Sequence, residues 1–212
     1  MESVAFCAIG IDIGKKADPS AVCVVMAEER NQNQRGESET HYMVPFLQRL
    51  PLQTKYPQQV ARFVEIIKGA AEKCYGICPP CEIFADVTGV GEGVLDLLEP
   101  ELMKIGLRGL HRVRFMHGDK LLVNPGRHIS IGKSWMGSRL QILAESQRVH
   151  LPDIPEARAL GEELLDFDID VDEDGGEKLG AMRPGKHDDL VISLALATLK
   201  EMHRGRARIA GV

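Results

Sequence analysis

Carboxylates interrupt hydrophobic segments at three places in this sequence. Asp12 lies inside the apolar run AIGIDIG, Asp86 ends the run CEIFAD, and Asp188 and Asp189 precede the run LVISLALA. Because an unpaired carboxylate is costly to bury, each of these acids needs a positively charged partner. Hard divalent cations take oxygen ligands, so one metal centre could satisfy all four carboxylates.

A centre of this kind is suited to breaking phosphodiester bonds. Two divalent ions about 3.5–4 Å apart can clamp a scissile phosphate, one activating the attacking water and the other stabilising the leaving oxygen. The N-terminus of a helix that begins near Asp188 would also favour ionised carboxylates. Simpler interpretations exist for two of the acids, because Asp188 can be a helix N-cap and Asp86 can be a turn residue.

The hydrophobic pattern predicts the elements that would position these acids. Three strands come first, over residues 4–13, 20–27 and 41–50, and would form an antiparallel meander. Helices and strands then alternate: helix 56–74, strand 81–86, helix 91–106 with a possible kink at Pro100, strand 110–118, helix 134–151, strand 162–172 and helix 187–203.

This order predicts an α/β fold with a mixed sheet of five or more strands, the first three antiparallel, and helices on both faces. In such a sheet the first and fourth strands can be neighbours. The last helix can then place its N-terminus over them, which would bring the acids together.

Length and composition favour one globular domain. The 212 residues are 44% hydrophobic, and we expect a core over about residues 4–203 followed by a flexible basic tail. No run of about 18 apolar residues predicts a membrane span, and the N-terminus does not resemble a signal peptide. The five cysteines are odd in number and unevenly spaced, which fits a reducing cytoplasm better than a disulfide framework.

Three of the cysteines form the pattern C-x3-C-x2-C. Cys74, Cys78 and Cys81 could be three ligands of a zinc ion. A structural zinc site uses four ligands, however, and no fourth stands close by in the sequence. Free cysteines are therefore the favoured interpretation.

The formal net charge of −5 conceals two oppositely charged segments. Residues 101–148 contain nine Lys or Arg and three acids, whereas residues 153–177 contain eleven acids and one Arg. The basic segment could bind an anionic polymer despite the net charge. Two solvated faces of opposite sign explain the same pattern equally well.

Two glycine-rich segments come close to nucleotide-binding motifs. GRHISIGKS, residues 126–134, is one residue longer than the Walker A spacing, and no clear buried strand leads into it. GVGEG, residues 89–93, lacks the spacing of the dinucleotide fingerprint. We expect its glycines to let the backbone pass close to Asp86.

Four stretches together resemble the C-terminal nuclease domain of the large subunit of phage terminases, the motors that package and cut viral DNA. They are GIDIGKKADPSAVCVV, FADVTGVGEGVLDLL, GRHISIGKSWMGSRLQILAESQRVHLP and GKHDDLVISLALA, and with their spacing they cover most of residues 8–200. The resemblance implies a ribonuclease H-like fold. It also implies an endonuclease that cuts double-stranded DNA during genome packaging with two Mg²⁺ or Mn²⁺ ions.

The same resemblance implies roles for individual residues. Asp12, Asp86 and Asp189 match the metal-binding acids, and Asp188 matches the acid beside them. Asp18 matches a recurrent acid after the first strand. Lys15, in the turn after the first strand, is a further accessory candidate. The candidates for contacts to DNA phosphates are Lys120, Arg127, Lys133 and Arg139.

The resemblance also implies partners and a location. Double-stranded DNA would be the substrate, and a terminase ATPase domain, the small terminase subunit and the portal would be protein partners. The location would be the cytoplasm of the host bacterium, with no membrane involved. Terminase large subunits usually begin with an ATPase motor, whereas this sequence starts in the nuclease-like part and has no good Walker A motif. We therefore expect either an isolated domain or a nuclease encoded without its motor, unable to translocate DNA by itself.

Three alternatives remain open. A Holliday-junction-resolvase-like nuclease of the same fold would need the same carboxylates but would cut branched DNA. GIDIGKKADPSAV also resembles the phosphate-binding hairpin of actin-like ATPases, although those need two related lobes and a longer chain. A non-catalytic DNA-binding or assembly module could keep the fold, but the full set of expected acids argues against it.

Overall fold

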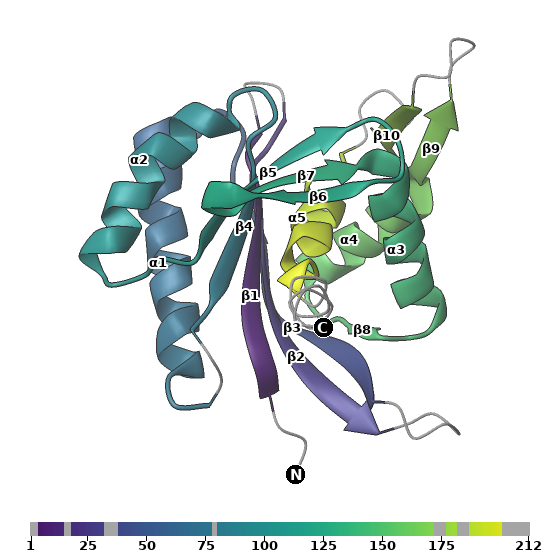
Figure 1. Ribbon diagram of the computed structural model, residues 1–212, viewed down its shortest axis with the longest axis horizontal. Coiled ribbons are helices and arrows are strands. Elements are labelled where there is room, and N and C mark those ends of the chain that lie inside the picture. The colour runs from purple at the N-terminus through teal and green to yellow at the C-terminus, as the bar shows by residue number, and fades with distance from the viewer. Residues whose placement is uncertain are drawn as a thin grey trace.

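The structure of the chain is a computed structural model that describes residues 4–14, 18–31, 38–77, 80–171, 177–181 and 187–200 (Figure 1). Its elements are, in chain order, β1 (Val4–Asp12), β2 (Ala21–Asn31), β3 (Ser38–Arg49), α1 (Tyr56–Cys74), β4 (Glu82–Asp86), α2 (Gly91–Lys104), β5 (Leu110–Met116), β6 (Leu121–Asn124), the 3-10 turn η1 (Pro125–Arg127), β7 (His128–Gly132), α3 (Lys133–Glu145), β8 (Val149–His150), α4 (Pro155–Asp166), β9 (Phe167–Val171), β10 (Glu177–Ala181) and α5 (Asp189–Ala197).

An eight-stranded mixed sheet forms the centre of the molecule, in the strand order β6-β7-β5-β4-β1-β2-β3-β8. β1, β2 and β3 form the expected antiparallel meander, whereas β1, β4, β5 and β7 run parallel to one another. β9 and β10 form a separate antiparallel pair. The predicted mixed α/β fold and the expected pairing of the first and fourth strands are confirmed.

Helices cover both faces of this sheet, as Figure 1 shows. α1 and α2 pack on one face, here called the α1 face, and α3, α4 and α5 pack on the other, the α5 face. Successive side chains of β1 point alternately to the α1 face and to the α5 face. Ile9 and Ile11 join the core of the α1 face, whereas Phe6 and Ala8 join the core of the α5 face. The same alternation places Asp12 on the α5 face.

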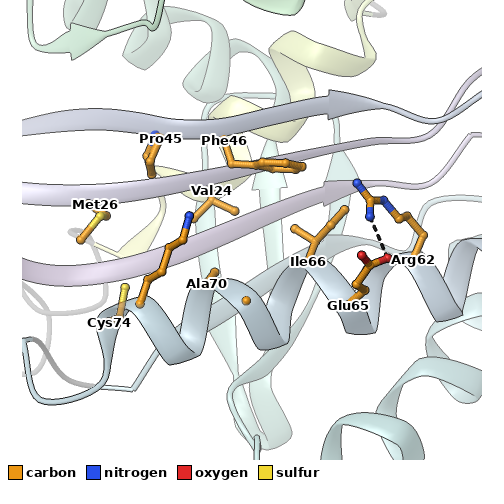
Figure 2. Close-up of a pocket in the computed structure, with 11 residues that line it drawn as sticks. Val24, Met26, Pro45, Phe46, Arg62, Glu65, Ile66, Ala70 and Cys74 are labelled. Carbon is orange, nitrogen blue, oxygen red and sulfur yellow. Dashed lines mark hydrogen bonds and ion pairs between the residues drawn. The ribbon is translucent and has the colours of Figure 1, made fainter.

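The α1 face carries a groove of about 270 Å³ between α1 and the strands β2 and β3. Figure 2 shows Val24 and Phe46 pointing from the strands toward Ile66 of α1. The sheet separates this groove from Asp12, so the groove and the predicted acid site are different features of the molecule.

The structure departs from the predicted elements in several places. The predicted helix over 134–151 ends at Glu145, and Val149–His150 form the short strand β8. The predicted strand over 162–172 is wrong in its first part, where α4 extends to Asp166, and is correct for β9. Leu160 and Leu164 of α4 recur at helical spacing, but the alternating letters that follow them conceal this pattern. The predicted helix over 91–106 is confirmed as α2, which contains Pro100 and ends at Lys104. The sequence does not predict β6 and β7, because β6 has only four residues, most of them exposed.

Two further expectations concern the C-terminal tail and membrane spans. The predicted flexible tail lies outside the described residues, as does Lys15. Among the described helices, none combines the length and the apolar composition that crossing a bilayer requires.

Candidate metal centre

β1 and β4 place Asp12 and Asp86 next to each other at one edge of the sheet. The two strands are parallel and Ile11 lies opposite Ala85, so the next residue along each strand is one of the two acids. Neighbouring strands are about 4.8 Å apart. Both acids are in phase with side chains of the α5 face, such as Phe84. They therefore project from adjacent strands onto the same face.

A close contact between β1 and α5 sets the position of the third acid. A Cβ atom on Gly10 would lie 1.9 Å from the Ser193 carbonyl oxygen and 2.6 Å from the Ala197 nitrogen, so the contact requires glycine. Gly10 shares the α5 face with Asp12, two residues further along β1. Asp189 lies about one helical turn before Ser193. The first turn of α5 is therefore held beside Asp12.

Asp189 is buried and only one of its oxygens is paired. Its Oδ2 atom accepts a hydrogen bond of 2.7 Å from Arg49 Nε, whereas its Oδ1 atom has no hydrogen-bond partner among the described residues. Arg49 ends β3 and also pairs through Nη2 with Glu163 of α4. Glu163 Oε2 in turn accepts hydrogen bonds of 3.0 and 3.1 Å from the backbone N–H groups of Leu190 and Val191. This network holds the Asp189 carboxylate in place and leaves a buried oxygen available for a cation.

Asp188 stands at the N-cap of α5, but its side chain makes no capping hydrogen bond. Glu163 satisfies two N–H groups of the first turn instead. The N-cap interpretation of Asp188 is thus correct for its position and wrong for its side chain. Its charge raises the pKa of both Asp12 and Asp86, so Asp188 belongs electrostatically to the acid cluster.

The four acids repel one another. Burial and the charges of Asp86, Asp188 and Asp189 raise the pKa of Asp12 well above its ordinary range. Burial also raises the pKa of Asp86 and of Asp189. A divalent cation bound among these carboxylates would relieve the repulsion between them.

The loop after β4 wraps closely around Asp86. The Thr88 N–H group donates a hydrogen bond of 2.7 Å to Asp86 Oδ1, so the turn interpretation of this acid is correct as far as it goes. A Cβ atom on Gly91 would lie 2.1 Å from the Asp86 carbonyl oxygen. The expected role of the GVGEG glycines in this close approach is therefore confirmed for Gly91.

Comparison by sequence finds no matching family model and no matching curated protein. Comparison of structures does find matches. The large terminase nuclease of thermophilic phage G20c with bound magnesium is 23% identical, with a TM-score of 0.59, over 91% of this chain and 79% of that one. The human cytomegalovirus terminase nuclease domain, soaked with Mn, is 11% identical, with a TM-score of 0.59, over 94% and 86% of the two chains. The large terminase nuclease domain of bacteriophage SPP1 with bound Mn is 13% identical, with a TM-score of 0.53, over 94% and 88%.

These matches come from phages and from an animal virus, and each covers nearly the whole chain. The chain has the fold of a terminase nuclease domain. The resemblance found in the sequence, with the ribonuclease H-like fold that it implies, is confirmed at the level of the fold. At these identities the match concerns architecture, so the roles of individual residues depend on the geometry described above.

Within this terminase nuclease fold, the basic residues predicted to contact DNA lie in two settings. Lys133 begins α3 directly after β7, at the same sheet edge as the acids, and its charge lowers the pKa of Asp86. Lys120 and Arg127 are exposed on either side of β6. Asp18, the predicted accessory acid, is exposed and adds to the negative charge around the cluster.

Arg139 is partly buried and makes internal contacts. Its Nη2 atom donates hydrogen bonds of 2.8 Å to the Tyr42 hydroxyl and 3.1 Å to the Thr198 carbonyl oxygen. Its guanidinium lies over the Trp135 ring, 5.9 Å from the centroid. These contacts tie α3 to β3 and to the end of α5, and the contact of Arg139 with a DNA phosphate stays a prediction.

The sequence reasoning missed Arg49 and Glu163. Arg49 has no local signal in the sequence, because it reaches the acids only through the strand register, which pairs Asp12 with Ala21 and Ala21 with Arg49. Glu163 has no such signal, because the segment around it is misread as a strand.

Proposed function

We propose that the chain is a metal-dependent endonuclease that cuts double-stranded DNA in viral genome packaging, in the manner of a terminase large-subunit nuclease domain. One observation carries the proposal: Asp12 and Asp86 end adjacent parallel strands, and the charges of Asp86, Asp188 and Asp189 all act on the buried Asp12 carboxylate. The fold supports it, because terminase nucleases that share this fold have been crystallised with magnesium or soaked with manganese.

The residues present fit a centre for two Mg²⁺ or Mn²⁺ ions. Asp12, Asp86, Asp188 and Asp189 offer only oxygen ligands, and Oδ1 of Asp189 is a buried acceptor without a hydrogen-bond partner among the described residues. When bound, such ions activate a water molecule for in-line attack on the phosphodiester and stabilise the leaving oxygen. We assign the four carboxylates as the ligands.

Residues around the acids would orient the reaction. Arg49 holds Oδ2 of Asp189, which fixes the direction of the remaining oxygen. Lys133, at the same edge, is suited to bind a phosphate beside the cleaved bond. The exposed Lys120 and Arg127 would extend this contact along the DNA backbone without reading its sequence.

The same proposal names the other components of the packaging machine as partners. A terminase ATPase domain would supply translocation, and the small terminase subunit and the portal would bring DNA to the nuclease. These assignments follow from the terminase type of the proposed activity and share its test.

Cleavage of supercoiled plasmid in Mn²⁺, comparing the unmodified chain with Asp86→Asn, tests the proposal. We expect Asp86→Asn to lower the cleavage rate by about 10³-fold, because losing a ligand removes several kcal/mol of metal-assisted stabilisation. Asp153→Asn is the matched control, since this carboxylate is exposed and pairs with Arg158 on the surface. It should cleave at the rate of the unmodified chain.

Three outcomes would contradict the proposal. Full activity in Asp86→Asn would remove the acid cluster from the chemistry. Preference for four-way junctions over linear duplex would favour the junction-resolving alternative. ATP hydrolysis without DNA cleavage would favour the actin-like alternative.

A further inference from the structure

Three cysteines from separate elements meet just before the point where β1 begins to pair with β4. Cys7 belongs to β1, Cys74 is the last residue of α1, and Cys81 directly precedes β4. Their sulfur atoms all lie within 4.8 Å of one another, and all three side chains are buried. Cys78, which the sequence pattern groups with Cys74 and Cys81, lies outside the described residues.

The register of the sheet explains why Cys7 joins this group. Ala8 lies opposite Glu82, so the preceding residues, Cys7 and Cys81, are neighbours on adjacent strands. Both belong to the core of the α1 face, where the C-terminal end of α1 brings Cys74 against them.

We propose that Cys7, Cys74 and Cys81 form a thiolate site for a soft or borderline divalent metal ion such as Zn²⁺. Thiolates prefer such ions to Mg²⁺. Sulfur atoms bound to zinc at roughly 2.3 Å in tetrahedral geometry lie about 3.8 Å apart, so small side-chain rotations suffice to close the site. Three ligands from three elements would tie the end of α1 to β1 and β4.

An entry path leads to this thiolate site. A cavity of about 660 Å³ is lined by Cys74 and Cys81 together with Tyr75 and Leu107. An ion can therefore reach two of the thiols from solvent, and a water molecule in the cavity can supply a fourth ligand.

Ordinary packing of small apolar residues explains a single buried cysteine, and Cys23 is an example on the α5 face. It does not require three thiols to converge from distant parts of the chain. Cys23 is therefore the matched control for Cys74, because both are buried cysteines in the core of the sheet.

Cobalt binding tests the thiolate site in the full chain. The reduced and chelator-treated protein is titrated with Co²⁺, whose bond to thiolates gives a charge-transfer absorption in the near ultraviolet. We expect one equivalent of Co²⁺ to produce this absorption and Zn²⁺ to displace it. Cys74→Ser should lose the absorption, and Cys23→Ser and Asp86→Asn should keep it, since carboxylate-bound cobalt gives no such absorption.

A second measurement covers the case in which Cys74→Ser fails to fold. In the unmodified chain, Zn²⁺ should protect three thiols from a thiol-specific reagent and release protons from those still protonated. No absorption in the unmodified chain, equal absorption after Cys74→Ser, or a disulfide in place of bound metal would overturn the proposal.

Discussion

β1 and β4 lie side by side, and their two ends carry different chemistry. Just before their pairing begins, Cys7 lies beside Cys81 and faces α1, and where it ends, Asp12 lies beside Asp86 and faces α5. Five residues separate the two ends along each strand, so about 17 Å lies between them. Because five is an odd number, the alternation of side chains puts the thiols and the acids on opposite faces.

The comparison shows how much one register determines. A slip of one residue between β1 and β4 would separate both pairs, because every side chain would then face the wrong neighbour. The proposed site of soft sulfur ligands and the proposed site of hard oxygen ligands lie on opposite faces of the sheet, so ions suited to one would not compete at the other. We expect changes at the acid end to leave the thiol end intact.

Among the substitutions that should affect the acid end and not the thiol end, Gly10→Val should have the largest effect. The added side chain meets backbone atoms of α5 that cannot rotate away, which should lower the free energy of unfolding by about 3 kcal/mol and displace Asp189 from Asp12. Urea unfolding and plasmid cleavage in Mn²⁺ measure the two consequences. Cleavage should fall at least tenfold, and the cobalt absorption of the thiol end should remain in the folded fraction.

Gly69→Ala is the control for this substitution. Gly69 lies in α1 beside the groove of Figure 2, and a Cβ atom there would meet nothing within 4 Å. This variant should gain roughly 0.5–1 kcal/mol from improved helix propensity. Equal stability of the two variants would show that β1 and α5 are not in close contact.

Arg49→Met should have the next largest effect. It leaves Asp189 and Glu163 without their shared guanidinium, which should cost about 2 kcal/mol. This is less than the roughly 3–5 kcal/mol of a fully buried pair, because the Arg49 side chain is 29% exposed. Thermal unfolding with and without Mn²⁺ measures the loss, and the ion should recover part of it by replacing the positive charge.

The surface pair of Arg158 and Asp153 provides the control for Arg49. Arg158→Met should change stability by less than about 0.5 kcal/mol, because both side chains are largely exposed. If Mn²⁺ stabilised the Arg49→Met and Arg158→Met variants by the same amount, the Arg49 pair would have no part in metal binding.

The acid end could be predicted from the sequence because a charge in an apolar strand is a local signal. Asp12 and Asp86 stand out within a few residues of text, and the run after Asp189 marks the helix that brings the third acid. The glycines that follow Asp86 are also a signal close to it in the sequence. What the sequence could not supply is the cation beside these acids, since Arg49 reaches them through two strand pairings.

The thiol end could not be predicted, because it depends on long-range pairing. The spacing of Cys74, Cys78 and Cys81 suggests a local motif, whereas the register of β1 and β4 selects Cys7. Local sequence patterns also mislead at α4. The alternation of acidic and apolar residues before β9 predicts a strand, although Leu160 and Leu164 have helical spacing.

A pH titration should separate the two ends of the strand pair. The pKa values of Asp12, Asp86 and Asp189 are raised in the folded chain, so without metal their contribution to stability is lost as pH rises above about 4. Glu82, beside the thiol end, behaves oppositely. A hydrogen bond with His111 lowers its pKa to about 2, so its contribution is present above about pH 4.3 and is lost as pH falls toward 2.

Thermal unfolding of the metal-free chain across this pH range measures both contributions. Asp12→Asn should raise the Tm near neutral pH and make the fall of Tm with rising pH less steep. It removes a buried negative charge that the charges of Asp86, Asp188 and Asp189 repel. Glu82→Gln should lower the Tm at neutral pH and leave the fall of Tm with rising pH unchanged. A neutral-pH Tm that fell in Asp12→Asn would mean that this carboxylate is already neutralised without a metal ion.

The smallest effect should come from Lys133→Ala, which tests whether the acid end faces DNA. Losing one phosphate contact should weaken binding to any duplex by about 1 kcal/mol, roughly fivefold, and reduce the slope of log affinity against log salt by about 1. Fluorescence anisotropy with a labelled duplex over a range of NaCl concentrations measures both quantities. Lys68→Ala is the control, because Lys68 is exposed on α1, across the sheet from the acids. An unchanged salt slope in Lys133→Ala, or an equal change in Lys68→Ala, would place the DNA away from this edge of the sheet.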